Sequence, residues 1–231
     1  MSSYFNTSEF TTALPTSQEQ ASLSFSMPKI FTPERKKITL ASGQTLLAIG
    51  TKNHHICRVL SGALKVAIPS PITRGRHKDT LITDKILGAG EIHGFEDYLY
   101  QRASTVQVIA AAITEVEMIS YDEIDQQKNP KLLQEFLLQA ANDLENQRKN
   151  KSFQYLASIR QKIAHKLLEL SDKFGEAQEN EILIQLKLSR SEIAQLAGTI
   201  NESLSRHLSD FENENIIRLE GRLIFIKDQA R

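Results

Sequence analysis

Four polar side chains within the stretch "TINESLSRHLSDF", near the C-terminus, recur at the spacing of one face of an α-helix. Glu202, Ser205, Arg206 and Ser209 follow i, i+3, i+4 and i+7, which places them on one stripe. Arginine can donate two hydrogen bonds to guanine, glutamate can accept one from cytosine, and serine can pair with either kind of base edge. The stripe therefore predicts contacts with base edges in a DNA major groove. The alternative interpretation is a polar surface that faces only water.

Two short helices joined by a glycine are expected to hold this stripe. Ser189 and Glu192 form a capping box that begins the first helix, and Gly198 ends it in the left-handed conformation. Thr199 with Glu202 predicts a second capping box, so that the second helix begins almost at once. The inward faces are apolar: Ile193, Leu196 and Ala197 in the first helix, and Ile200, Leu204, Leu208 and Phe211 in the second. This arrangement is typical of a helix-turn-helix.

The segment "IIRLEGRLIFIKD" that follows predicts a β-hairpin turning at Glu220 and Gly221, the wing of a winged helix. Arg218 and Arg222 flank this turn and are candidate contacts to DNA phosphates. Arg190 and Ser191, at the start of the first helix, are further candidate DNA contacts. Basic and acidic residues are nearly balanced from Ser158 onward, so the motif and not the net charge carries the prediction.

The composition sets the class of protein. The chain has 231 residues, of which 40% are apolar and 24% charged, and its formal net charge is zero. These values are typical of a globular protein with one large domain or two small ones. The only cysteine, Cys57, excludes an internal disulfide and suits a reducing compartment. The sequence shows neither an apolar run of membrane-spanning length nor a secretion signal, so we expect a cytoplasmic protein without a membrane partner.

Four regions follow one another along the chain, and together they predict an α+β fold. Residues 1–27, rich in Ser and Thr, are expected to form a flexible tail. Residues 28–128, the candidate sensor domain, contain short Val- and Ile-rich runs broken by glycine, and these runs predict an antiparallel β-roll. Residues 129–157 are expected to form a long dimerisation helix, and residues 158–231 the winged helix-turn-helix domain.

The long helix has the pattern of a helix that packs along a narrow stripe. Leu133, Leu137, Ala140 and Leu144 recur at three- and four-residue steps. A second copy of the chain is the favoured partner, because a seam between two helices needs only such a stripe. The other interpretation is that the helix lies across its own β-domain.

These features together resemble the CRP/FNR family of bacterial transcription regulators. "LSRSEIAQLAGTINESLSRHLSDFENENII" and the following hairpin are similar to the family's C-terminal domain. "ASGQTLLAIG", "HHICRVLSGALKV" and "ILGAGEIHG" are similar to its N-terminal β-roll, a jelly roll like that of cyclic-nucleotide-binding domains. The resemblance covers about Ile30 to Asp228. It implies a homodimer that binds double-stranded DNA and RNA polymerase, and that is not an enzyme.

The resemblance also implies roles for individual residues of the second helix. Glu202 and Arg206 match the Glu and Arg that the family uses on a C·G and a G·C pair, and Ser205 matches the Ser of the FNR branch. Asn201 stands where the CRP branch has a base-reading Arg, which favours palindromes of TTGAT-like over TGTGA-like half-sites. The sequence departs from the pattern at Ile200, where the family usually has Ser or Thr.

The cyclic-nucleotide pocket of this family carries Gly-Glu, then a loop, then Arg followed by Ser or Thr. Here Gly94 is followed by Phe95, Arg102 is followed by Ala103, and the loop is shorter than in CRP. Gly94, Arg102 and Ala103 are thus the candidate ligand residues of a degenerate pocket, which predicts no response to cyclic AMP. Arg102 could still bind an anion or form a surface salt bridge.

No cofactor or metal is expected, although a cyclic nucleotide and haem remain open alternatives. An iron–sulfur cluster needs several cysteine ligands, and the chain has only Cys57. His54 and His55 are adjacent, so on a strand they would point to opposite faces; His55 and Cys57 could share one. Neither His77 nor His93 completes a metal site in this pattern, and buried Cys57 is expected to be inert. No catalytic constellation is present either.

A second hypothesis concerns what the C-terminal domain binds. The chain could be a regulatory module that responds to a cyclic nucleotide or another small ligand and docks a protein through this domain. Salt dependence distinguishes the two, since affinity for duplex DNA falls steeply as salt rises.

Overall fold

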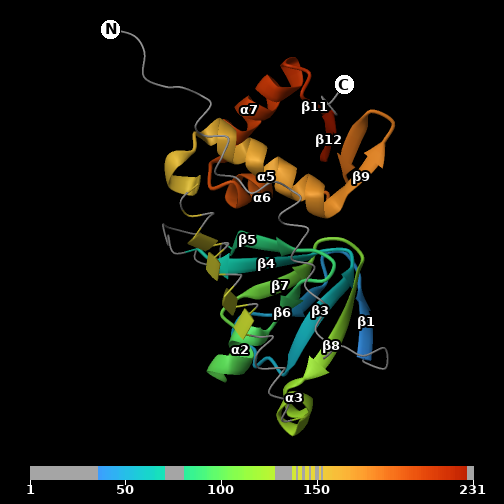
Figure 1. Cartoon of the computed structure of the whole chain (residues 1–231), viewed down its shortest axis with the longest axis vertical. Helices are drawn as coiled ribbons and strands as arrows, with labels where there is room; N and C mark the ends of the chain where they lie inside the picture. The colour runs from blue at the N-terminus through green and yellow to red at the C-terminus, as the bar shows by residue number, and fades with distance from the viewer. Residues whose placement is uncertain are drawn as a thin grey trace.

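Two four-stranded antiparallel sheets face each other in the N-terminal lobe of the chain, seen in a computed structural model (Figure 1). The structure describes residues 36–70, 81–127, 137–138, 140–141, 144–145, 147–148, 151 and 153–227. The predicted tail, residues 1–27, lies outside this set. In the first sheet the order is β1 (Lys36–Leu40), β8 (Thr114–Ser120), β3 (His55–Ser61) and β6 (Ile92–His93). In the second it is β2 (Thr45–Leu47), β7 (Gln107–Ala110), β4 (Leu64–Pro69) and β5 (Leu81–Leu87).

The inner faces of the two sheets share an aliphatic core. Val59 and Val116 from the first sheet and Leu64, Val66 and Val108 from the second belong to one buried cluster. Burial of such side chains stabilises the lobe because it removes apolar surface from water. These strands lie where the Val- and Ile-rich runs predict them, and the predicted β-roll is confirmed.

The turn between β3 and β4 shows why one glycine is required. Gly62 has a φ of 80°, which side chains rarely adopt. A Cβ atom added there would lie 2.2 Å from the carbonyl oxygen of Ile113, so no other residue fits. The close approach joins the two sheets at this end of the roll.

Two short helices, α2 (Phe95–Tyr100) and α3 (Tyr121–Gln127), complete the N-terminal lobe. The described residues between 137 and 156 are helical, in agreement with the predicted long helix, whose start near Pro130 lies outside the described residues. The helical path is interrupted by a bend at Ala157 and by Ser158, which has extended backbone (ψ 161°). Helix α5 (Ile159–Phe174) then begins at a capping box of Ser158 and Gln161 and has Gly175 as its C-cap.

The C-terminal lobe packs three helices against a third sheet. Helices α6 (Arg190–Leu196) and α7 (Asn201–Asn213) follow α5. The sheet has the order β11 (Ile217–Glu220), β12 (Leu223–Lys227), β10 (Glu181–Ile184) and β9 (Gly175–Gln178). The predicted α+β class, with an N-terminal β-roll and a C-terminal helix-turn-helix that carries a hairpin, is therefore confirmed. Within the described residues, no helix is long and apolar enough to cross a membrane.

Candidate nucleic-acid interface

The first helix of the motif, α6, begins at the predicted capping box. The Ser189 hydroxyl accepts a hydrogen bond from the Glu192 amide at 3.2 Å, and the Glu192 carboxylate accepts one from the Ser189 amide at 2.7 Å. The inward face that the sequence predicts is buried: Ile193, Leu196 and Ala197. Gly198 follows with a φ of 65°, the left-handed conformation expected at the end of a helix.

The second helix, α7, begins one residue later than the predicted cap. Ile200 occupies the N-cap position and no side chain accepts a hydrogen bond there, so the predicted capping box of Thr199 and Glu202 is wrong. The reason lies in the turn, because the Thr199 amide donates to the carbonyl of Ala194 and Thr199 thus belongs to the end of α6. Ile200 itself is 63% exposed, whereas the sequence placed it on the buried stripe. The other members of that stripe are buried as expected: Leu204, Leu208 and Phe211.

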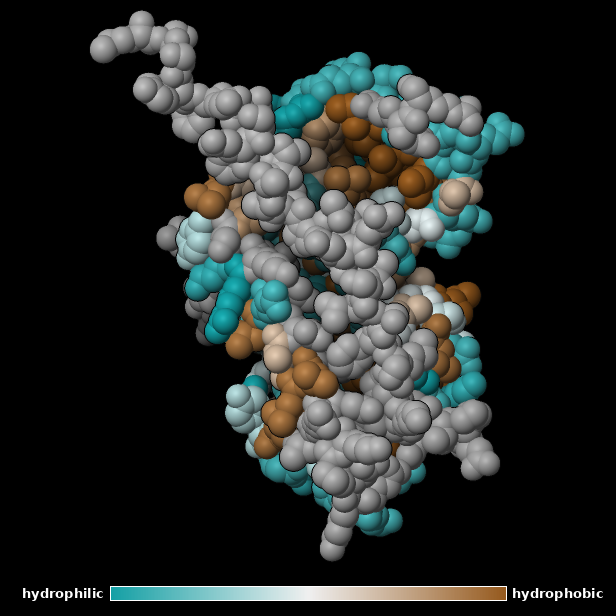
Figure 2. Space-filling view, in the orientation of Figure 1, coloured by the Kyte–Doolittle hydropathy of each residue, from teal (hydrophilic) through white to brown (hydrophobic). Residues whose placement is uncertain are grey.

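The polar stripe of α7 faces away from the protein. Asn201, Glu202, Ser205, Arg206 and Ser209 are all exposed. Among the described residues, the side chains of Glu202 and Arg206 have no hydrogen-bond or ion-pair partner. Figure 1 shows α7 at the end of the molecule remote from the β-roll, and Figure 2 shows hydrophilic residues along that margin. The stripe is therefore free to contact another molecule.

The hairpin beside α7 forms as predicted, with Glu220 paired to Leu223 across a two-residue turn. Gly221 has a φ of 60°, and Arg222 is exposed at the tip, one residue beyond the turn expected from the sequence. This is the geometry of a wing that projects a single cation.

Arg218, the other candidate phosphate contact beside the turn, is held by contacts within the protein. Its guanidinium donates to the Glu181 carboxylate, with an Nη2–Oε2 distance of 2.6 Å, and also to Glu220. It lies over the ring of Phe225 as well, 3.6 Å from the centroid. The hydrogen bonds from Arg218 hold the pKa of Glu181 below its usual value, so the ion pair is maintained at neutral pH.

The start of α6 contacts the tip of the wing. Arg190 donates from Nη2 to the carbonyl oxygen of Gly221 at 3.4 Å, and burial lowers the pKa of its guanidinium. Ser191, one residue further, is exposed and accepts a hydrogen bond from Gln195 at 3.4 Å. Of the two candidate contacts at this end of α6, Ser191 is thus accessible and Arg190 is half-buried against the wing.

The predicted ligand residues of the β-roll have structural roles of their own. Gly94 has a φ of 99°, and an added Cβ would lie 2.6 Å from the carbonyl oxygen of His55, so a glycine is needed to bring α2 close to β3. Arg102 is exposed and its guanidinium lies 4.5 Å from the centre of the Tyr100 ring. Ala103 forms an isolated antiparallel bridge with Lys52.

A cavity of about 250 Å³ lies in the β-roll, and none of the three predicted ligand residues lines it. Its walls come from β2, the loop before β3, and the strands that carry Cys57, His93 and Met118. His54 and His55 both line it, although the sequence placed them on opposite faces; His54 precedes the strand, so the alternation of β3 does not apply to it. In the described part of the chain no group of three or more His, Cys, Asp or Glu could hold a metal.

Burial governs the two titratable groups deepest in this cavity. It raises the pKa of the Cys57 thiol to about 12, which keeps the thiol protonated and poorly reactive. It lowers the pKa of His93 to about 4, so this imidazole is neutral at physiological pH. Neither group carries the charge that would hold an ionic effector.

Sequence reasoning missed the contacts that join the two lobes. Glu192, predicted only as a cap, also forms an ion pair with Lys65 of β4. Gln195, to which the sequence gave no role, accepts a hydrogen bond from Thr83 of β5. A local pattern cannot reveal partners that are 127 and 112 residues away along the chain.

Comparison with known proteins identifies the family of the C-terminal domain. Residues 161–231 match the Crp-like helix-turn-helix domain family. A CRP-like cAMP-activated global transcriptional regulator of Mycobacterium tuberculosis is 26% identical over 204 residues, which cover 87% of this chain and 88% of the relative.

Two of the solved structures that match share the fold over most of the chain. A CRP/FNR-family transcriptional regulator from Thermus thermophilus superposes with a TM-score of 0.69 at 19% identity, covering 84% of this chain and 94% of that one. The c-di-GMP responsive global regulator CLP of Xanthomonas campestris gives 0.68 at 18% identity, covering 84% and 95%. At these identities the likeness concerns the fold alone.

Proposed function

The chain belongs to the CRP/FNR family of DNA-binding transcription regulators, and from that premise we propose that it acts as a homodimer on a near-palindromic site. Each half-site would be TTGAT-like, and the protein would not respond to cyclic AMP. Such a regulator works together with RNA polymerase and therefore in the cytoplasm. The observation that carries the proposal is the exposed polar stripe of α7 beside the projecting tip of the wing.

The chemistry of the stripe suits base readout. Arg206 would donate its two hydrogen bonds to a guanine, Glu202 would accept from a cytosine, and Ser205 would contact a neighbouring base edge. Asn201, at the start of α7, would lie where the CRP branch has an arginine, and replacing it by arginine should shift the preferred half-site toward TGTGA. These assignments agree with the exposure of all four side chains.

The phosphate contacts would come from the elements that flank α7. Arg222 at the tip of the wing and Ser191 near the start of α6 are both exposed. Arg190 would contribute mainly by holding the wing through Gly221. Contacts of this kind fix the orientation of the protein on the duplex, whereas α7 supplies sequence preference.

The proposed dimer would form through the helix that precedes α5. Five large apolar side chains among its described residues are exposed: Leu137, Leu138, Leu144, Tyr155 and Leu156. The most exposed of them is Leu156, at 88%. Apolar side chains that recur along one helix are expected to pack against a second helix. A two-fold dimer would then present two α7 helices to successive major grooves about one helical turn apart.

The proposed lack of response to cyclic AMP follows from the candidate pocket. The mycobacterial relative is named as cAMP-activated, but in this chain Phe95 and Ala103 stand at the two positions where the family pocket has Glu and a hydroxyl residue. Without these groups the ribose would lose the carboxylate that accepts its hydrogen bond, and the phosphate would keep only Arg102 of its two partners.

Selection of bound sequences from a random duplex pool, with and without cyclic AMP, tests the proposal. We expect an enriched palindrome with TTGAT-like arms, unchanged by the nucleotide, and affinity that falls steeply with salt. Enrichment of a TGTGA-like motif would refute the half-site, and enrichment only with cyclic AMP would refute the proposed insensitivity. A pool without any enriched sequence would favour a domain that docks a protein.

The dimer has its own test by sedimentation. Leu156→Glu should convert the dimer to a monomer, because it puts a charge into the proposed seam. Ile113→Glu is the matched control, since Ile113 is 73% exposed on the β-roll and lies outside that helix. A wild-type monomer, or equal effects of the two substitutions, would refute the seam.

A further inference from the structure

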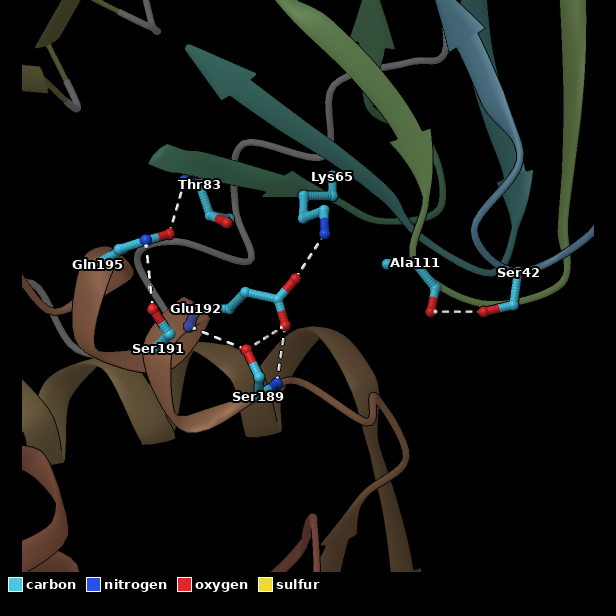
Figure 3. A network of polar contacts seen from close by, with 8 residues as sticks. All are labelled: Ser42, Lys65, Thr83, Ala111, Ser189, Ser191, Glu192 and Gln195. Carbon is cyan, nitrogen blue, oxygen red and sulfur yellow. Dashed lines mark hydrogen bonds and ion pairs between the residues drawn. The ribbon is translucent and has the colours of Figure 1, made fainter. Parts of the chain in front are cut away.

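Helix α6 of the helix-turn-helix lies directly on the sheet of the β-roll that contains β4 and β5 (Figures 1 and 3). Ala63 and Ile86 of the β-roll belong to the same buried cluster as Ile193 and Leu196 of α6. The two lobes thus share a continuous apolar core. The polar stripe of α7 lies outside this buried cluster and stays exposed.

Two polar contacts add direction to this apolar contact. Lys65 of β4 donates from Nζ to the Glu192 carboxylate at 2.5 Å, and the amide of Thr83 in β5 donates to the side-chain carbonyl of Gln195 at 2.9 Å. Glu192 and Gln195 are three residues apart and lie on one face of α6. Figure 3 shows both side chains pointing toward the sheet. Two hydrogen bonds at separate points restrict rotation of α6, which a single apolar contact would allow.

Glu192 acts on both lobes at once. Its second carboxylate oxygen accepts from the amide and the hydroxyl of Ser189, at 2.7 and 2.8 Å, and so caps α6. Burial acts to raise the pKa of this carboxyl, but hydrogen bonds from Lys65 and Ser189 outweigh it and hold the pKa below the usual value. The carboxylate therefore remains charged, and it ties the start of α6 to β4.

A second pair restrains the other end of the same interface. Lys173, in the last turn of α5, donates to Glu91 at 3.0 Å, and Glu91 also accepts from the amide of Gly88 at 2.6 Å. A Cβ added to Gly88 would lie 3.3 Å from the ring of Phe174. The C-terminal lobe is thus held at α6 and at the end of α5.

The segment before α5 packs against the C-terminal lobe: the rings of Phe153 and His165 are 4.7 Å apart, and Gln154 lies next to Gly198. The helical path that leads to the C-terminal lobe is broken at Ala157 and Ser158. The contacts of Phe153 and Gln154 hold the residues on both sides of this break to the C-terminal lobe, so these contacts do not fix that lobe on the β-roll. The orientation of α7 is consequently set by the interface between α6 and the β-roll.

We infer that Glu192 and Gln195 are positioning residues that fix the angle of the helix-turn-helix on the β-roll. In the homodimer proposed above, on which this consequence rests, that angle sets the distance between the two α7 helices. The pair acts through α6 and does not itself read bases. Loss of the pair therefore affects the tolerated spacing between half-sites and leaves the half-site sequence unchanged.

Lys65→Met tests the positioning role of Glu192 by a change on the β-roll side of the contact. Methionine keeps the aliphatic length of Lys65 and removes its charge, while Ser189 and Glu192 still cap α6. Lys166→Met is the matched control, because Lys166 pairs with Glu169 at the same 2.5 Å distance but within α5. Lys65→Arg restores a cation and should restore the wild-type behaviour.

The measurement is binding to duplexes in which two preferred half-sites are separated by different numbers of base pairs. Wild-type protein should prefer one spacing strongly, and Lys65→Met should lose much of that preference while it selects the same half-site. A spacing profile of Lys65→Met that matches those of wild type and Lys166→Met would overturn the inference. So would a changed half-site motif.

A second measurement does not depend on DNA. Amide hydrogen exchange at Thr83 in the full-length protein should be slow in wild type, and about tenfold faster in Gln195→Met, because the acceptor is lost. Equal exchange in the two proteins would overturn the role of Gln195. If wild type selects no duplex, the proposed function fails, but Thr83 protection still decides whether α6 is held on the β-roll.

Discussion

Arg218 and Glu181 form a two-point ion pair across the C-terminal sheet, with Nε–Oε2 and Nη2–Oε2 distances of 3.1 and 2.6 Å. The pair joins the start of β10 to β11, on either side of β12. The pair keeps Arg218, one of the two arginines near the wing, in contact with other residues of the protein. The other, Arg222, is left at the exposed tip of the turn.

The two arginines should therefore differ in their effect on DNA binding. Arg222→Ala should weaken binding to all duplexes about equally and reduce the slope of log affinity against log salt by about 1, because one phosphate contact is lost. Arg218→Ala should leave that slope unchanged and lower the stability of the wing instead. Salt titrations of both variants check this, and equal slopes for the two would contradict it.

Arg206 should carry readout at one base pair. Arg206→Ala should cost about 1–3 kcal/mol on the preferred site and relax the preference at one G·C pair. Arg206→Lys keeps the charge but not the planar pair of donors, so it should lose the preference while it retains affinity for random duplex. Competition binding with single-base variants of the site measures both effects. An equal loss on random DNA in Arg206→Ala would contradict direct readout.

Ile200 should be replaceable with a gain in stability. Serine accepts a hydrogen bond from the first turn of a helix, which isoleucine at an N-cap cannot do, so Ile200→Ser should raise the free energy of unfolding by about 1 kcal/mol. The loss of apolar contact is small, since the side chain is 63% exposed. Thr199→Ala is the control and should change little, because Thr199 does not cap α7. Urea denaturation measures the free energy of unfolding of both variants. If Thr199→Ala loses more of this free energy than Ile200→Ser gains, Thr199 and not Ile200 caps α7.

His93 should make the stability of the β-roll sensitive to acid. Burial lowers its pKa to about 4 in the folded protein, against about 6.5 when unfolded. Below pH 6.5 the unfolded chain binds a proton that the folded chain does not, so stability is complete above pH 6.5 and falls as the pH drops toward 4. The loss amounts to about 3 kcal/mol.

The control for this pH dependence is His93→Gln, which cannot titrate. Its free energy of unfolding, measured between pH 7 and 4, should fall less steeply than that of wild type. The burial of His55 also lowers its pKa, so some dependence should remain in the variant. Identical slopes for His93→Gln and wild type would show that His93 does not titrate in this range.

Local signals were sufficient for the elements but not for contacts between distant parts of the chain. The capping box at Ser189 and the glycine at position 198 predicted α6 correctly because both act within one turn of helix. The cap of α7 was predicted at the wrong residue because the Thr199 amide bonds to the end of α6. The preference of threonine for N-cap positions does not reveal that the end of another helix competes for this residue. The ion pair of Arg218 was not predicted for another reason: pairing of β10 and β11 with β12 brings in Glu181, 37 residues earlier. The fate of a charge depends on such pairing.

The apolar cluster that contains both Ile86 and Ile193 also bears on how the molecule could be taken apart. Salt weakens polar contacts between two lobes, but it does not weaken an apolar core that they share. We therefore expect the β-roll and the C-terminal lobe to unfold in one cooperative transition. If this C-terminal lobe were fused to the β-roll of another protein, the aliphatic side chains that now pack between α6 and the β-roll would be exposed to water. The β-roll and the helix-turn-helix lobe of this chain are therefore two halves of one folding unit.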